Sequence, residues 1–386
     1  MRVCAWSTTL VTLLGATSGL LAQTSHAGAR ARRAAPVATR PRALSAPFRL
    51  CAGGDVMLGT NLDSAWARFA AETLRTRYGL EPDPDSLLAP LKPLVQDADV
   101  VLLNVEGAIG EGPAPRKCSA DAKWCFAFRQ PKATARALGR LVDSSVAIVG
   151  NVANNHSRDA GDDGRDMTVA YLNAAGVHVT GNDTLATAVP LADGDTIGVL
   201  GFHTDSTSPD ARDLAAVRRH VARASRRFSV VIVTMHLGAE GRSAQRTRDA
   251  NERFLKTIDR GNPVRFADAA FRGGATLVVG HGPHVLRAVE WRGDRLVFYS
   301  LGNLLTYGPF KLREPTNRGV VACASIDAAR HVASAELRPT VQLWPGVLRA
   351  DTTQRALWLI DSLGALDFPR SGARVDSLGM LEKRKP

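Results

Sequence analysis

Short apolar runs alternate with longer amphipathic segments along most of the chain. Several runs are rich in β-branched residues and apolar throughout, which is typical of strands buried on both faces. The runs cover residues 48–52, 100–103, 146–149, 197–202, 230–235, 277–279, 296–299 and 320–326. The amphipathic segments, which have helical spacing, are residues 131–141, 167–175, 212–227 and 249–258. This alternation predicts an α/β fold.

Polar side chains that could bind metals or take part in catalysis follow six of these strands. They are Asp55, then Asn104 and Glu106, then Asn154, Asn155 and His156, then His236, then His281 and His284, and finally Asn303. Ligand sites of α/β sheets lie beyond the carboxyl ends of the strands. The six loops are therefore expected to converge on one edge of the sheet.

These side chains are carboxylates, carboxamides and imidazoles, and the set contains no cysteine. Such donors suit divalent manganese, zinc or iron better than a metal that prefers sulfur. Two such ions, about 3.5 to 4 Å apart, would polarise a substrate oxygen and acidify a water molecule. We therefore expect a site for one or two divalent metal ions.

Six motifs in these loops resemble, in order, those of the poly-gamma-glutamate capsule synthesis (CapA-like) family, which is similar to the calcineurin-like metallophosphoesterases. They are Gly54-Asp55-Val56-Met57, Asn104-Val105-Glu106, Ala153-Asn154-Asn155-His156 with Asp159 and Gly161, His236-Leu237-Gly238-Ala239-Glu240, Gly280-His281-Gly282-Pro283-His284-Val285 and Tyr299-Ser300-Leu301-Gly302-Asn303. The resemblance spans residues 50–305. It implies a four-layer αββα sandwich with two mixed sheets.

The same resemblance implies roles for individual residues. The metal ligands would be Asp55, Glu106, Asn155, His236, His281 and His284. His156 would protonate the leaving group, a task that suits a side chain with a pKa near neutrality. Supporting or substrate-contacting roles fall to Asn154, Asp159 and Glu240, while Asn303 is assigned a structural role.

The chain also departs from the family pattern. Met57 stands where classical phosphoesterases carry a histidine, so one imidazole ligand is missing and the number of ions stays open at one or two. Leu237 and Gly241 replace aromatic residues, and Gly282 stands where a second histidine is common. The substrate contacts are therefore expected to differ from those of other family members.

The first residues have the three parts of a secretory signal peptide: Arg2, an apolar run over residues 10–22, and small residues ending at Ala27. The domain organisation predicted is a signal peptide over 1–27, a flexible Ala/Arg/Pro linker over 28–46, a CapA-like domain over 47–340, and a helical C-terminal extension and tail over 341–386. The protein is expected to be exported to the periplasm or beyond. Membrane attachment would come only through an uncleaved signal peptide.

The net charge of +12 does not indicate a nucleic-acid partner. Seven arginines and no acidic residue lie in the first 50 residues, so the rest of the chain carries +5. No basic stripe interleaved with exposed aromatic residues is present. A P-loop, a G-x-S-x-G elbow and a dinucleotide fingerprint are also missing from the sequence.

Four cysteines would remain after signal cleavage. Cys118 and Cys125 are close enough in sequence to close a small disulfide loop in an oxidising compartment, although spacing does not establish the pairing. Cys51 and Cys323 lie in apolar strand-like runs, where the expectation is of small buried side chains.

The function expected is a metal-dependent, phosphoesterase-like hydrolase site in capsule or poly-gamma-glutamate biosynthesis. An anionic polymer or a phosphoester would be the substrate, and a capsule synthesis complex a partner. Two alternatives stay open, a non-catalytic polymer-binding or export component and a general secreted metallophosphoesterase, because fold and motif do not fix a reaction.

Overall fold

The computed structural model describes residues 43–59, 62–113, 115, 126–205 and 209–384. The expected signal peptide, most of the expected linker, and Cys118 and Cys125 lie outside these residues. The last linker residues, 43–46, lie against the folded domain. Leu44 is buried there, and Ser45 Oγ donates to Asp193 Oδ2 over 2.8 Å.

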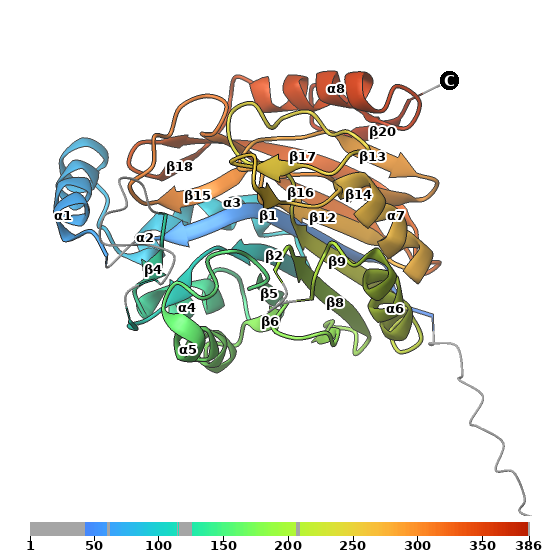
Figure 1. Ribbon diagram of the computed structural model, residues 1–386, viewed down its shortest axis with the longest axis horizontal. Helices are drawn as coiled ribbons and strands as arrows, with labels where there is room; N and C mark the ends of the chain where they lie inside the picture. The colour runs from blue at the N-terminus through green and yellow to red at the C-terminus, as the bar shows by residue number, and fades with distance from the viewer. Residues whose placement is uncertain (1–42, 60–61, 114, 116–125, 206–208, 385–386) are drawn as a thin grey trace, which may run out of the picture. The chain divides into compact units, whose positions relative to one another are not determined.

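Two mixed β-sheets form the centre of the domain (Figure 1). The larger has the order β18-β17-β16-β1-β2-β5-β6, with β15 also paired to β1. Its strands are β1 (Phe48–Leu58), β2 (Val100–Val105), β5 (Ala147–Asn151), β6 (His178–Thr180), β15 (Asn303–Tyr307), β16 (Arg318–Ile326), β17 (Val332–Leu343) and β18 (Val347–Ala350). The smaller has the order β13-β14-β12-β9-β8-β7. Its strands are β7 (Thr187–Pro190), β8 (Thr196–His203), β9 (Val231–His236), β12 (Leu277–His281), β13 (Val289–Arg292) and β14 (Arg295–Phe298).

Three apolar clusters show how the layers stack. The central cluster joins the two sheets, with Leu50 and Leu102 from one and Ile232 and Val279 from the other. The second cluster packs helices on the outer face of the larger sheet, and the third packs helices on the outer face of the smaller one (Figure 1). The predicted four-layer αββα sandwich with two mixed sheets is confirmed.

The helices divide between these outer layers. On the larger sheet lie α1 (Ser64–Thr73), α2 (Pro84–Leu88), α3 (Lys92–Val95), α4 (Ala133–Gly139) and α5 (Gly161–Ala174); on the smaller lie α6 (Leu214–Ser225) and α7 (Pro263–Gly273). Both α6 and α7 begin at polar caps, because Asp213 and Asn262 each accept a hydrogen bond from a first-turn backbone N–H.

The C-terminal part differs from the expected helical extension. The expected boundary at residue 341 falls inside β17, and residues 347–350 continue the same antiparallel ladder as β18. The helix α8 (Arg355–Asp367) begins only after that ladder, and its buried residues Ala356, Leu357 and Ile360 join the central cluster. Two short strands, β19 (Ala373–Val375) and β20 (Leu381–Lys383), follow it. This segment therefore completes the sandwich.

The predicted helix over residues 249–258 is wrong. The segment forms a short hairpin of β10 (Arg253–Phe254) and β11 (Ile258–Asp259). Its charged residues have helical spacing, but buried ion pairs at both ends of the hairpin hold the chain to the domain. Tertiary contacts thus override the local pattern.

Cys51 and Cys323 are buried, as expected, but the bond between them was not foreseen. They are direct partners on the antiparallel strands β1 and β16, and they form a disulfide with an S–S distance of 2.08 Å. Because 272 residues separate them in the chain, no local pattern could reveal the pairing.

Removing this disulfide is expected to destabilise the fold. The Cys51→Ala/Cys323→Ala variant should lose about 2–4 kcal/mol of unfolding free energy, because the cross-link restricts the unfolded chain. Urea denaturation followed by circular dichroism measures the loss. Equal midpoints for the oxidised wild type and the variant would show that the link contributes nothing.

Candidate metal centre

Side chains from the ends of strands in both sheets meet at one edge of the sandwich. Asp55 lies in β1 just past a register irregularity, and Glu106 directly follows β2. His236 and His281 are the last residues of β9 and β12 and are register partners. Parallel pairing of β9 with β12 thus sets the two imidazoles side by side.

The distances within this group are short. His284 Nδ1 lies 2.9 Å from Asp55 Oδ2, and His236 Nε2 lies 3.2 Å from Glu106 Oε1. His281 Nδ1 lies 3.8 Å from Asp55 Oδ1. One ligand atom each from Asp55, Glu106 and His284 all lie within 4.8 Å of one another. The structure therefore brings five of the six expected metal ligands into one cluster.

The turn after β12 shows why a glycine stands at position 282. Gly282 has a φ of 105°, and a Cβ there would lie 3.2 Å from His236 and 3.0 Å from Arg260. A second histidine at this position would be strained and would crowd His236. His284 itself adopts a left-handed φ of 58°, which turns its ring toward Asp55.

The two carboxylates have opposite pKa shifts. Burial would raise the pKa of Asp55, but the hydrogen bond and charge of His284 hold it well below its usual range. Burial and the charge of Asp55 raise the pKa of Glu106. The cluster therefore holds the firmly ionised carboxylate of Asp55 beside the carboxyl group of Glu106, which keeps its proton to a higher pH than an ordinary glutamate.

The histidines also differ. Burial opposes charge on His284, yet Glu106 and Asp55 raise its pKa to about 10. Burial lowers the pKa of His281 to about 4, and burial together with Arg260 lowers that of His236 well below its usual value. His236 and His281 are thus neutral imidazoles, the form that binds metals.

The cluster fits a divalent cation. His281 is buried, and neither of its ring nitrogens has a hydrogen-bond partner within the described part of the chain. Buried polar groups are normally satisfied, so this imidazole calls for a partner. Its neighbours are oxygen and nitrogen donors, which suit manganese, zinc or iron.

The loop after β5 brings further polar side chains, Asn154, His156 and Asp159, into contact with the residues around Asp55 and with one another. Asn154 Nδ2 donates to Val105 O over 2.8 Å, and Asn104 Nδ2 donates to Asp55 Oδ1 over 2.8 Å. His156 is buried, and its Nδ1 lies 2.7 Å from Asp159 Oδ2. The ring of Phe128 covers the His156 ring at a centroid distance of 4.2 Å. Asp159 thus fixes the orientation of His156.

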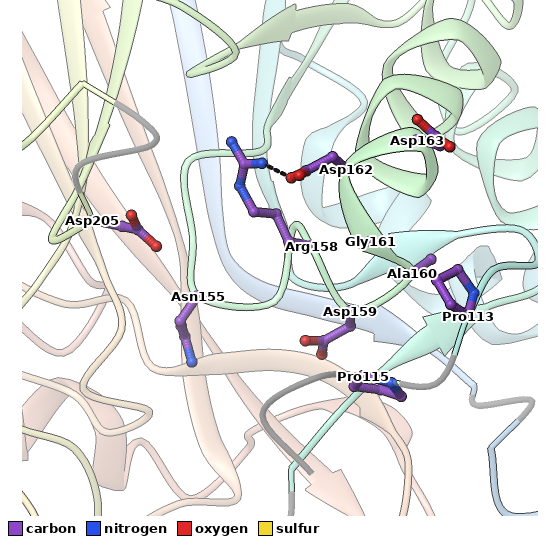
Figure 2. A pocket seen from close by; sticks show the side chains of 10 residues that line it. All are labelled: Pro113, Pro115, Asn155, Arg158, Asp159, Ala160, Gly161, Asp162, Asp163 and Asp205. Atoms are coloured by element: carbon purple, nitrogen blue, oxygen red, sulfur yellow. Dashed lines mark hydrogen bonds and ion pairs between the residues drawn. The ribbon is translucent and has the colours of Figure 1, made fainter. Parts of the chain in front are cut away.

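Asn155 lies on the wall of an adjacent cavity of about 510 Å³. Figure 2 shows it facing this space along with Asp159, Arg158 and Asp205. Arg158 forms an ion pair with Asp162 on the same wall (Figure 2). The cavity offers room for a substrate next to Asn155 and Asp159.

Three residues contact the ligand group without having been given a ligand or supporting role from the sequence, although Asn104 and Asn303 were among the side chains expected at this edge. Asn104 contacts Asp55, and the Oδ1 of Asn303, expected to be structural, lies 3.1 Å from His284 Nδ1. Arg260 is buried, with its Nη2 3.0 Å from Glu240 Oε1 and 3.5 Å from His236 Nδ1. The position of Asn104 two residues before Glu106 was a usable signal. Arg260 gave none, because it stands in an arginine-rich stretch.

Three other histidines lie outside the ligand group. His203 ends β8 beside His236, and its Nδ1 lies 3.2 Å from the His236 carbonyl oxygen. Burial lowers its pKa well below the usual value. His178 is half-buried on β6, and His220 lies on α6.

Cation binding is expected to strengthen as the pH rises. Because the pKa of His284 is raised to about 10, the ring carries a proton below that pH, and this proton must leave before the nitrogen can bind a metal. The affinity for Mn²⁺ should thus increase up to about tenfold per pH unit between about pH 6.5 and 8.5. Isothermal titration calorimetry of chelator-treated protein measures it. An Mn²⁺ affinity that does not change with pH would contradict the assigned role of His284. A His220→Gln variant serves as a control and should show the same pH dependence of the affinity as the wild type.

Known proteins resemble this chain in sequence. The family model described as "Bacterial capsule synthesis protein PGA_cap" matches residues 49–307. The PGA biosynthesis protein CapA of Bacillus subtilis (strain 168) is 27% identical over 185 residues, which are 43% of this chain and 44% of that protein. An uncharacterised protein, y4sH, of Sinorhizobium fredii is 34% identical over 94 residues, which are 24% of this chain and 18% of that protein. The chain thus spans less than half the length of these relatives.

Two solved structures are also similar. The 5'-nucleotidase precursor of Thermus thermophilus matches 82% of this chain and 58% of its own, at 13% identity and a TM-score of 0.35. GAP50, the anchor in the inner membrane complex of Plasmodium, matches 82% of this chain and 95% of its own, at 9% identity and a TM-score of 0.30.

Proposed function

Because the chain belongs to the bacterial capsule synthesis family PGA_cap, within the metallophosphoesterase-like superfamily, we propose that it is an exported, metal-dependent hydrolase acting in capsule formation. Its substrate would be a phosphoester, or an amide bond of an anionic polymer such as poly-gamma-glutamate. The Bacillus relative is described as a PGA biosynthesis protein.

The observation that carries the proposal is the buried His281. Both of its ring nitrogens lack hydrogen-bond partners among the described residues, and it faces Asp55 in a group that also contains Glu106, His236 and His284. A protein interior keeps such a costly arrangement when a cation satisfies it. Perturbed pKa values in one cluster are also a feature of functional sites.

The ligand set would be Asp55, Glu106, His236, His281 and His284, with Asn155 as a sixth donor from the cavity wall. When bound, a divalent cation supplies Lewis acidity to a substrate oxygen and makes water a nucleophile near neutral pH. The oxygen atom of water would form a bond to phosphorus or to carbonyl carbon as the bond to the leaving group breaks.

His156 would hand the leaving group its proton. Asp159 holds Nδ1 of the ring, so the proton would pass from Nε2 on the opposite side. Burial of His156 beneath Phe128 limits the access of bulk water to that proton. The chain's own residues thus supply orientation, proton transfer and a dry environment.

The Cys51–Cys323 disulfide supports export, since disulfides persist mainly in oxidising compartments. Among the described residues, none of the helices is both long and apolar enough to cross a bilayer.

A turnover assay tests the proposal. Purified protein with added Mn²⁺ should hydrolyse a chromogenic phosphodiester or shorten poly-gamma-glutamate, and a chelator should stop the reaction until metal is restored. Metal binding with no hydrolysis of either substrate would overturn the enzyme proposal and favour a component that only binds polymer.

A further inference from the structure

The β10–β11 hairpin is hydrogen-bonded to Gly238 and Ala239, which follow the expected metal ligand His236. Before β10, the Glu252 carboxylate accepts hydrogen bonds from the Ala239 backbone N–H over 2.7 Å and from the buried Arg287 over 2.7 and 2.8 Å. After β11, Arg260 Nε donates to Gly238 O over 3.1 Å. Both ends of the hairpin are thus tied to residues just past His236.

The tip of this hairpin exposes apolar side chains. Leu255 is 69% exposed and Ile258 is 46% exposed. Ile258 pairs across the hairpin with Phe254, which is half-buried. A rigid base therefore presents two large aliphatic groups to the outside, where water contact is unfavourable for them.

The turn is built from residues that disfavour its backbone. Leu255 has a φ of 49° and Lys256 a φ of 64°, both in the left-handed region. Glycine and asparagine are the residues that usually occupy such hairpin positions. A leucine and a lysine in their place indicate that the side chains at the tip matter more than the ease of turning.

The charge that remains available on the hairpin is positive. Arg253 and Lys256 form no ion pair within the described residues. The acidic groups nearby are engaged, since Glu252 pairs with Arg287 and Glu240 with Arg260. Asp259, opposite Arg253 in the register, accepts the Gly261 backbone N–H over 2.9 Å and keeps its negative charge. Two cations therefore stand against one anion on the hairpin, and its net charge outside the ion pairs is positive.

We propose that the tip of the β10–β11 hairpin docks the protein on an anionic lipid bilayer. Leu255 and Ile258 would enter the boundary between head groups and acyl chains, and Arg253 and Lys256 would lie at the lipid phosphates. A soluble polyanion would be attracted by the two cations but would give the exposed aliphatic side chains no partner. This inference goes beyond the proposed hydrolase and does not depend on its chemistry.

Docking would orient the molecule. Because the hairpin is tied to the segment beginning at His236, contact at its tip would hold the metal centre next to the membrane surface.

Vesicle binding by the full-length chain tests the proposal. Wild type should co-sediment with vesicles of phosphatidylglycerol and phosphatidylcholine more strongly than with phosphatidylcholine alone. The Arg253→Gln/Lys256→Gln variant should lose about fivefold in affinity for each cation removed. Leu255→Asn, which suits the left-handed turn, should weaken binding without disturbing the fold. Arg226→Gln and Leu378→Asn, at exposed positions elsewhere, should bind like wild type.

A fluorescence measurement separates the two kinds of partner. In a Leu255→Trp variant, the emission added over wild type should shift to the blue with anionic vesicles and stay unchanged with soluble poly-gamma-glutamate. Hairpin variants that bind vesicles like wild type would overturn the proposal. So would a shift caused by the polymer but not by vesicles, which would identify an anionic polymer as the partner.

Discussion

Replacing His281 with alanine is expected to weaken divalent metal binding by at least about 100-fold, a larger loss than substitution of a partner that only orients a ligand. The imidazole is buried and neutral, and its ring nitrogens have no competing partner within the described residues. Its loss would remove one neutral nitrogen ligand from the set that also contains Asp55 and Glu106, so the cation would be bound by fewer donors. Hydrolysis should fall in parallel.

Calorimetric titration of chelator-treated protein with Mn²⁺ gives the change in affinity, and thermal unfolding verifies that the variant folds. His178→Ala is a matched control, because His178 is a half-buried histidine on β6 and lies outside the ligand cluster. Unchanged Mn²⁺ affinity in His281→Ala, with normal folding, would remove His281 from the ligand set.

Replacing His156 with glutamine is expected to lower kcat by about 10²–10⁴-fold while metal binding stays intact. Glutamine keeps polar contacts but cannot transfer a proton near neutral pH. The Asp159→Asn variant should show a smaller loss, because Asp159 orients the His156 ring without itself donating the proton.

Leaving-group dependence separates proton transfer from a merely structural role. For His156→Gln, activity on esters with a poor leaving group should fall far more than activity on esters with a good one such as p-nitrophenolate. Equal losses on both kinds of ester would mean that His156 acts through structure rather than as an acid.

Much of the centre could be predicted from the sequence because its side chains follow recognisable strands. Asp55 and Glu106 follow apolar runs, and His236 and His281 end them. Parallel pairing brings neighbouring strand ends together. The two-sheet architecture came from the family resemblance, since apolar runs do not show which strands pair.

The rest depended on contacts between distant parts of the chain. Cys51 and Cys323 meet only because β1 and β16 lie side by side. The segment containing Arg253 and Ile258 had helical spacing, yet ion pairs to Arg287 and Glu240 fix it as a hairpin. Such tertiary pairs leave no periodic trace in the sequence.

Anomalous X-ray diffraction at the manganese absorption edge, on crystals grown with Mn²⁺, would show whether these five residues bind a metal ion. We expect one or two peaks about 2.0–2.3 Å from side-chain atoms of Asp55, Glu106, His236, His281 and His284. Crystals that contain manganese elsewhere, or none at these five residues, would contradict this expectation.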